Sequence, residues 1–271
     1  MNINIDFLGL DLDGTLLDSN KNITMFTKDK ILKFKQMGIG VIIASGRHCN
    51  EILKYAEELN FKKGDYIVCC DGQYITDYKG TILWENSYLT WNDVKIVLQN
   101  SGCNQCWFYT EIRNYQVEQR FFYRIYKKIN NSFFNNKNTT ILALQNQRNI
   151  EIKNIQKIVL NIKSEVLKQS FFDTYTIHLF QEGKMEILHK NVSKMNGIKY
   201  LTDVLKIHTD KILYFGDDEN DKECFELMRN CIAMGNASEI LKRNSIFITE
   251  DNEHDGVAIA LEKIVNGEII I

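Results

Sequence analysis

Residues 5–15 read Ile-Asp-Phe-Leu-Gly-Leu-Asp-Leu-Asp-Gly-Thr. The first eight of these positions form a short apolar run of strand length, and the run ends in Asp13-Gly14-Thr15, which is a turn signal. Apolar residues at helical spacing follow over residues 27–37. Strand, turn and helix in this order predict the start of a β-α-β unit.

The same alternation continues along the chain and returns near its end. Apolar runs of strand length and helical patterns follow one another, and such strands without polar alternation are typical of a parallel sheet covered on both faces. The predicted strands are residues 40–44, 65–70, 211–215 and 231–234, and the predicted helices are residues 51–59, 194–205 and 221–228. The sequence therefore predicts an α/β fold with a Rossmann-like parallel-sheet core.

The middle of the chain follows a different pattern. Polar and apolar residues alternate over residues 174–180 and 184–189, and aromatic residues gather at Trp107-Phe108-Tyr109. Alternation of this kind favours antiparallel strands. We predict an inserted α+β cap domain over residues 83–187, which interrupts a discontinuous core domain of residues 1–82 and 188–271.

Composition and charge exclude several classes of function. The chain has 271 residues and a net charge of −2, so no strong basic field exists to bind nucleic acid. No apolar window is long enough to span a membrane, and the first apolar stretch is interrupted by acidic residues, unlike a signal peptide. Seven cysteines, an odd number, suit a reducing compartment, and we read the Cys103-x-x-Cys106 pair as structural thiols. We expect a cytoplasmic protein, monomeric or weakly dimeric.

Polar clusters follow three of the predicted strands. Asp11 and Asp13 come after the first, Ser45 after the second, and a group of three aspartates, Asp217, Asp218 and Asp221, after Gly216. A lone aspartate at such a place is commonly a helix N-cap, but the carboxyl ends of parallel strands share one edge of the sheet, where these clusters meet. Carboxylates brought together without histidine or cysteine favour Mg²⁺. Lys194, Ser45 and the Gly46 amide, directed at the same place, suggest a phosphoryl group.

Four motifs follow one another along the chain in an order that resembles a known enzyme family. They are Asp11-Leu12-Asp13-Gly14-Thr15, Ser45-Gly46-Arg47, Ser193-Lys194 and Gly216-Asp217-Asp218-Glu219-Asn220-Asp221. In this order they resemble the haloacid dehalogenase-like hydrolases, and more narrowly the Cof-type sugar-phosphate phosphatases. Two further segments, Met234-Gly235-Asn236-Ala237 and Asp255-Gly256-Val257-Ala258, are similar to signatures of the same group.

The resemblance implies a cytoplasmic, Mg²⁺-dependent phosphatase that hydrolyses phosphomonoesters of small metabolites, sugar phosphates above all. It implies that Asp11 is the nucleophile and forms an aspartyl-phosphate, that Asp13 is the acid and then the base, and that Lys194 neutralises the nucleophile and the phosphate. The implied metal ligands are Asp11, the backbone carbonyl of Asp13, Asp217 and, directly or indirectly, Asp221. The implied phosphate or substrate contacts are Ser45, Gly46, Arg47 and Asn220, although Arg47 is also compatible with a surface residue that pairs with a helix.

Three positions depart from the family pattern, and two other functions stay open. Asp71 stands where asparagine is usual, Met195 where glycine is usual, and Asp218 where serine, glycine or asparagine is common. A phosphotransferase similar to the phosphomannomutases would use the same residues but pass the phosphoryl group to a sugar. A receiver-like signalling module also places acidic residues and a lysine at a sheet edge, but it is about half this length. We expect loops of the cap, at residues 111–115 or 181–184, to select the leaving group.

Overall fold

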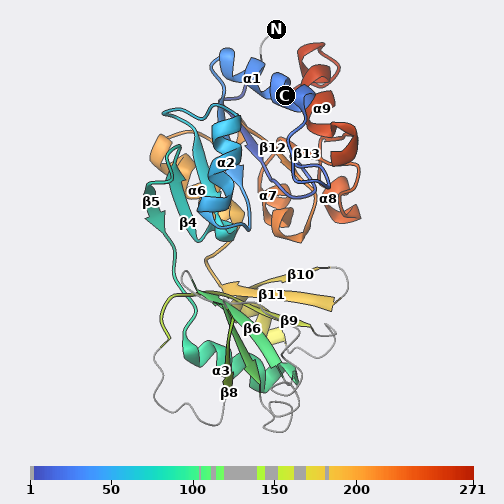
Figure 1. Ribbon diagram of the computed structural model, residues 1–271. Helices are drawn as coiled ribbons and strands as arrows, with labels where there is room; N and C mark the ends of the chain where they lie inside the picture. Colours follow the sequence, from blue (N-terminus) through green and yellow to red (C-terminus); the bar gives the residue numbers. More distant parts are fainter. Residues whose placement is uncertain are drawn as a thin grey trace. The chain divides into compact units, whose positions relative to one another are not determined.

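The computed structural model describes residues 3–103, 105–110, 114–118, 139–143, 152–161, 169–180 and 183–271. The chain divides into two compact units. The core unit comprises Met1–Asn86 and Val192–Ile271, and the inserted unit comprises Ser87–Asn191. Figure 1 draws the core unit with both chain termini and the inserted unit with its own sheet. The chain thus leaves the core unit once and returns to it once.

The core unit is built on one eight-stranded sheet with the strand order β14-β13-β12-β1-β2-β3-β4-β5. The strands from β14 to β3 pair in parallel, whereas β3, β4 and β5 pair antiparallel. The strands are β1 (Phe7–Leu10), β2 (Gly40–Ala44), β3 (Tyr66–Cys69), β4 (Tyr74–Asp77), β5 (Ile82–Glu85), β12 (Ile212–Gly216), β13 (Cys231–Ala233) and β14 (Phe247–Ile248). Because β1 lies between β2 and β12, the chain winds outward from it in both directions, as in a Rossmann-like fold.

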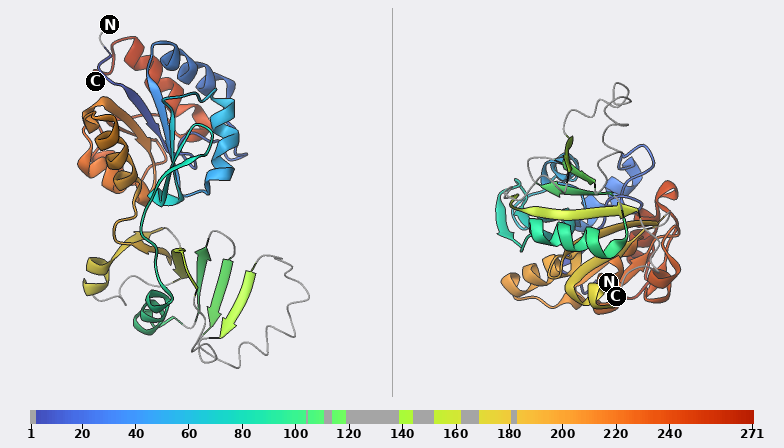
Figure 2. Two further views of the ribbon diagram at one scale, coloured as in Figure 1. Left: turned by 90° about the vertical axis from the view of Figure 1, so that its left-hand side faces the viewer. Right: turned by 90° about the horizontal axis from the view of Figure 1, so that it is seen from below.

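Helices lie on both sides of this sheet (Figure 2). On one side α1 packs against α9, and on the other side α6 packs against α7. With both faces covered, the central strands are apolar throughout, and every residue of β12 is buried. The helices of the core unit are α1 (Met25–Gln36), α2 (Cys49–Glu58), α6 (Lys194–Leu205), α7 (Lys222–Leu227), α8 (Glu239–Arg243) and α9 (Gly256–Val265), with short 3₁₀ turns η1 (Cys70–Gly72), η6 (Thr209–Lys211), η7 (Glu219–Asp221) and η8 (Asn252–His254).

The inserted unit has a separate six-stranded sheet with the order β10-β11-β9-β6-β7-β8. In the described part of this unit, the strand pairs are antiparallel except β7 with β8. Its own apolar core contains Trp91, Phe108 and Ile158. Its elements are α3 (Trp91–Ser101), β6 (Gln105–Thr110), β7 (Asn114–Glu118), β8 (Thr139–Ala143), β9 (Ile155–Asn161), α5 (Gln169–Thr174), β10 (Tyr175–Leu179) and β11 (Lys184–His189). The predicted fold class, a Rossmann-like core with an α+β insertion, is confirmed.

The antiparallel edge of the core sheet was not predicted. The expected start of the insertion at Leu83 falls inside β5, which pairs with β4 and belongs to the core unit. Residues of β5 are mostly exposed, so the strand lacks the apolar run that marked its neighbours. Of the cap loops expected to select the leaving group, residues 111–113 and 181–182 lie outside the described residues.

The cysteines are not all free thiols. Cys49, at the start of α2, forms a disulfide with Cys69, at the end of β3. This pair was not predicted, because a separation of 20 residues carries no signal in the sequence. Cys103 and Cys106 are free, and Cys106 is buried in the core of the inserted unit, as expected for structural thiols.

Candidate functional site

The candidate site lies at the carboxyl edge of the central strands of the core unit. The Asp11 amide continues the ladder beyond β1 by donating to the Phe215 carbonyl of β12 at 3.1 Å. Beyond β2, the Ser45 amide donates to the Val68 carbonyl of β3 at 2.9 Å. Asp217 follows directly after β12. The strand order therefore brings the three predicted clusters to adjacent strand ends.

Lys194 lies at the centre of the site and has no solvent exposure. It is the first residue of α6, where the Ser193 hydroxyl caps the helix by accepting from the Asn196 amide. Its Nζ lies 2.6 Å from Asp11 Oδ1 and 2.7 Å from Asp221 Oδ1. Burial alone would lower the pKa of Lys194, but the two carboxylates outweigh it and raise that pKa above its usual range. The lysine is therefore held as a cation.

A glycine allows α6 to begin this close to the sheet edge. A Cβ atom on Gly72, in η1, would lie 2.0 Å from the carbonyl oxygen of Ser193. Gly72 also has a φ of +90°, a conformation that other residues rarely adopt. The Asp71-Gly72 turn after β3 thus sets the start of the helix that carries Lys194.

Asp11, Asp217 and Asp221 form an acidic cluster in which the nearest carboxylate oxygens lie within 4.8 Å of one another. Burial raises the pKa of Asp11 well above its usual range, although Lys194 opposes the shift. Burial and the charge of Asp221 raise the pKa of Asp217 to about 7. Three carboxylates against one lysine leave an excess of negative charge, and a divalent cation with oxygen ligands relieves that repulsion. The donor set thus fits Mg²⁺.

The three carboxylates of the cluster are not equally available to a metal. Asp221 accepts four hydrogen bonds, which occupy both of its oxygens, from the Tyr214 hydroxyl, Lys194 and the backbone amides of residues 217 and 218. A carboxylate has about four acceptor positions, so Asp221 has none to spare. Among the residues that the structure describes, Asp217 accepts only from Thr15 at 2.8 Å and from Asn236 at 3.2 Å. The geometry favours Asp11 and Asp217 as direct ligands, with Asp221 holding Lys194 and the Asp217 backbone in place.

The Asp13 carboxylate takes part in a different set of contacts. It accepts from Arg47 Nε and Nη2, both at 2.6 Å, and from Lys21 Nζ at 2.7 Å. Partial burial would raise the pKa of Asp13, but the hydrogen bonds from Arg47 and Lys21 outweigh it and lower that pKa to about 2. The Asp13 side chain is not part of the acidic cluster, so the predicted role in metal binding rests on its backbone carbonyl.

The Ser45–Arg47 loop is tied to the turn after β3. The Asp71 amide donates to the Ser45 carbonyl at 3.0 Å, and the Ser45 hydroxyl accepts from the Arg47 amide at 3.3 Å. Asn220 Nδ2 donates to Asp71 Oδ1 at 2.8 Å. A Cβ atom on Gly46 would lie 2.9 Å from Asp71 Oδ2, so the extra carboxylate lies directly against the predicted phosphate loop.

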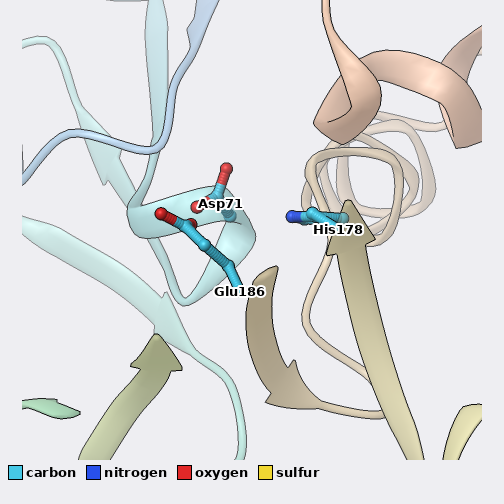
Figure 3. Close-up of side chains that lie close together, drawn as sticks. All are labelled: Asp71, His178 and Glu186. Atoms are coloured by element: carbon cyan, nitrogen blue, oxygen red, sulfur yellow. The ribbon is translucent and has the colours of Figure 1, made fainter. Parts of the chain in front are cut away.

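Figure 3 shows the Asp71 carboxylate on η1. It also draws His178 and Glu186, which are cross-strand partners on β10 and β11 of the inserted unit. Glu186 accepts from Lys157 at 2.9 Å and pairs with Lys184 at 2.6 Å, so within the inserted unit it is held by two cations.

Sequence reasoning missed four residues of the site: Thr15, Lys21, Tyr214 and Asn236. Two of them lie in segments that had been singled out, since Thr15 ends the first motif and Asn236 belongs to the Met234–Ala237 signature. Asn236 Nδ2 donates both to the Gly14 carbonyl at 2.8 Å and to Asp217. Tyr214 lies inside a strand and Lys21 inside a polar turn, where neither residue type stands out.

Comparison with known proteins identifies the family. The family model described as haloacid dehalogenase-like hydrolase matches residues 8–261. The chain belongs to this family. The predicted resemblance is confirmed, and with it the enzyme class of a hydrolase whose curated relatives are named phosphatases.

Relatives of this hydrolase cover nearly its full length. It is 25% identical to a phosphoglycolate phosphatase of Methanobrevibacter smithii, over 97% of this chain and all of the relative. It is 24% identical to 5-amino-6-(5-phospho-D-ribitylamino)uracil phosphatase of Bacillus subtilis, over 94% of this chain and 96% of the relative. The solved structure of a subclass IIB sugar phosphatase of the superfamily has a TM-score of 0.72 at 20% identity, covering 98% and 100% of the two chains. Among the described residues, no helix of this hydrolase has the length and apolar character of a membrane span.

Proposed function

We propose that this hydrolase is a Mg²⁺-dependent phosphatase that cleaves phosphomonoesters of small metabolites through an aspartyl-phosphate on Asp11. The observation that carries the proposal is the buried Lys194, which bridges Asp11 and Asp221 beside Asp217. A carboxylate nucleophile and a phosphate dianion repel each other, and a buried lysine together with a cation site is the arrangement that cancels this repulsion.

In the first step, Asp11 attacks the phosphorus atom. Lys194 occupies its Oδ1, which leaves Oδ2 as the attacking oxygen. The P–O bond to the leaving group breaks, and Asp13 supplies the proton that the leaving oxygen takes up. In the second step, Asp13 removes a proton from water, which attacks the phosphorus and frees Asp11. Asp13 lies two residues beyond the nucleophile, and it can take up the proton for the first step once Arg47, whose hydrogen bonds lower the pKa of Asp13, turns to the substrate phosphate.

We assign the metal site to Asp11, Asp217 and the backbone carbonyl of Asp13, with Asp221 acting indirectly. When bound, Mg²⁺ neutralises the phosphoryl oxygens and orients them for attack. The groups proposed to hold those oxygens are Ser45, the Gly46 amide, Arg47 and Asn220. Hydrogen bonds in the core unit support this set, because they connect the Ser45 loop to the Asp71 turn and the Asp71 turn to Asn220.

Sugar phosphates are the substrate class that we propose. The support is the name of the sugar phosphatase that shares the fold, together with the phosphorylated organic substrates in the names of the two relatives. Since we assign the core residues to the phosphoryl group, which all substrates share, we assign the choice of leaving group to the inserted unit as a cap.

The test is phosphate release from a panel of sugar phosphates and other phosphorylated metabolites with Mg²⁺ present. Asp11→Asn should reduce the rate more than 100-fold, about 3 kcal/mol of barrier. The matched control is Asp203→Asn, an exposed aspartate on α6, which should retain the rate. Full activity of Asp11→Asn, or activity in excess chelator, would contradict the proposal. Conversion of a sugar 1-phosphate to the 6-phosphate without phosphate release would identify a phosphotransferase instead.

A further inference from the structure

A lysine without a role in the mechanism above contacts the proposed acid. Lys21 Nζ lies 2.7 Å from Asp13 Oδ1, on the carboxylate that Arg47 holds through Nε and Nη2. The two cations come from different segments, because Lys21 follows β1 and Arg47 follows β2. One carboxylate is therefore held from two directions.

The segment that carries Lys21 is held in a defined conformation. Lys21 has a φ of 63°, in the left-handed region that residues other than glycine seldom adopt. Its amide donates to the Asp18 carbonyl at 2.9 Å, and the Asn22 amide donates to Asp18 Oδ1 at 2.8 Å. This turn directs the lysine back over the first motif.

A buried tyrosine joins the two cations. Tyr55, on α2, is 2% exposed. Its hydroxyl donates to the Lys21 carbonyl at 3.2 Å and accepts from Arg47 Nη1 at 3.3 Å. The contact between Lys21 and Asp13 is thus part of a network that reaches into the packed helix layer, rather than a chance pairing of surface charges.

We propose that Lys21 is a positioning residue, which keeps the Asp13 carboxyl directed at the leaving oxygen during phosphoryl transfer. The inference rests on the proposed function and deepens it. Arg47 is assigned to the substrate phosphate, and when its guanidinium turns to that anion, Lys21 is the cation that stays on Asp13 Oδ1. Oδ2 then stays directed at the ester oxygen as the P–O bond breaks.

The contact is suited to orientation rather than to stability. The Lys21 and Asp13 side chains are 51% and 42% exposed, and ion pairs this exposed contribute little to folding. Loss of the lysine should therefore leave the protein folded and should affect only reactions that need a well-placed acid.

The experiment compares kcat/KM for two substrates that differ in their need for an acid. A sugar 6-phosphate has an alkoxide leaving group that must be protonated, whereas 4-nitrophenyl phosphate has a leaving group that departs as an anion. Lys21→Met should lower kcat/KM for the sugar phosphate about tenfold and change that for the aryl phosphate less than about twofold. Lys21→Arg should restore most of the loss, and Tyr55→Phe should cause a smaller loss with the same substrate dependence.

The control is Lys30→Met, which removes a lysine paired with Glu262 on the surface between α1 and α9 and should leave both substrates unaffected. An equal fall on both substrates, or no fall with Lys21→Met, overturns the inference while the wild-type activity upholds the proposed function. Failure of the wild-type protein to release phosphate from either substrate overturns the proposed function, and the inference with it. Thermal melting of each variant shows that the comparison is made on folded protein.

Discussion

At the scale of single residues, the site combines one buried lysine with more carboxylates than it can neutralise. Lys194 contacts Asp11 and Asp221, while Asp217 adds a third carboxylate to the cluster. Asp71 adds a further negative charge beside Gly46. An excess of carboxylates attracts cations, and it repels a phosphate anion unless a metal ion is present.

The charge of Asp71 should weaken phosphate binding. Asp71→Asn removes this charge, and the side-chain oxygen of the new amide can still accept the hydrogen bond from Asn220. We expect inorganic phosphate, as a competitive inhibitor, to bind about threefold or more tightly to this variant, because one repulsive interaction with the anion is lost. Asp203→Asn is the control for loss of one negative charge elsewhere in the core unit. Unchanged or weaker inhibition would show that the Asp71 charge does not reach the bound anion.

The pKa of Asp217 predicts how the metal-free protein responds to pH. The folded protein raises this pKa from 3.8, the value of an ordinary aspartate, to about 7, so folding takes up a proton between these two pH values. The contribution of Asp217 to the free energy of unfolding is therefore greatest at low pH, and it is lost as the pH rises through about 7. In chelator, the melting temperature should be higher at about pH 5.5 than at about pH 8.

Two controls assign this pH dependence to the acidic cluster. Asp217→Asn should flatten it, because the titrating group is gone. Saturating Mg²⁺ should also flatten it, since a cation replaces the proton as the source of positive charge. A melting temperature that rises with pH in chelator would show that the cluster does not take up a proton on folding.

At the scale of elements, the cap of α6 links the fold to the chemistry. The Ser193 hydroxyl accepts from the Asn196 amide, and Lys194 is the next residue along the chain. Ser193→Ala should lower the free energy of unfolding by about 1 kcal/mol and reduce kcat, because the first turn that places Lys194 loosens. Ser193→Asp, which keeps a capping oxygen, should recover the stability. Chemical denaturation measures the free energy of unfolding. A loss of kcat without a loss of stability would show that the change at Lys194 does not come from the helix cap.

How far the sequence predicts these elements depends on burial. The predicted bounds of β2 and α6 coincide with those observed, because both carry a full apolar pattern and clear ends. The edge strand β5 was missed, since its side chains are mostly exposed and its pairing with β4 depends on the rest of the sheet. The aspartates of the motifs could be predicted because they directly follow strands. Lys21 could not be predicted, because a lysine in a polar turn resembles any solvent-exposed lysine, and only the fold brings it into contact with Asp13.

At the scale of the whole molecule, the two units have independent cores. The inserted unit has its own sheet and its own apolar cluster, whereas all residues assigned to the metal site belong to the core unit. A ligand stabilises only the structure that binds it, by an amount set by its concentration and dissociation constant. Mg²⁺ should therefore act on one unit of the chain alone.

Hydrogen exchange read by mass spectrometry tests this division. Mg²⁺ should slow exchange in peptides that cover β1, β12 and the start of α6, because binding at Asp11 and Asp217 suppresses local opening of these segments. Peptides from β6, β9 and β11 of the inserted unit should exchange at the same rate with and without the metal. In Asp217→Asn, the protection of the core peptides should be lost while exchange in the inserted unit stays unchanged. Equal protection of both units in the wild-type protein would mean that the metal site is not confined to the core unit, and that Asp11 and Asp217 do not account for metal binding by themselves.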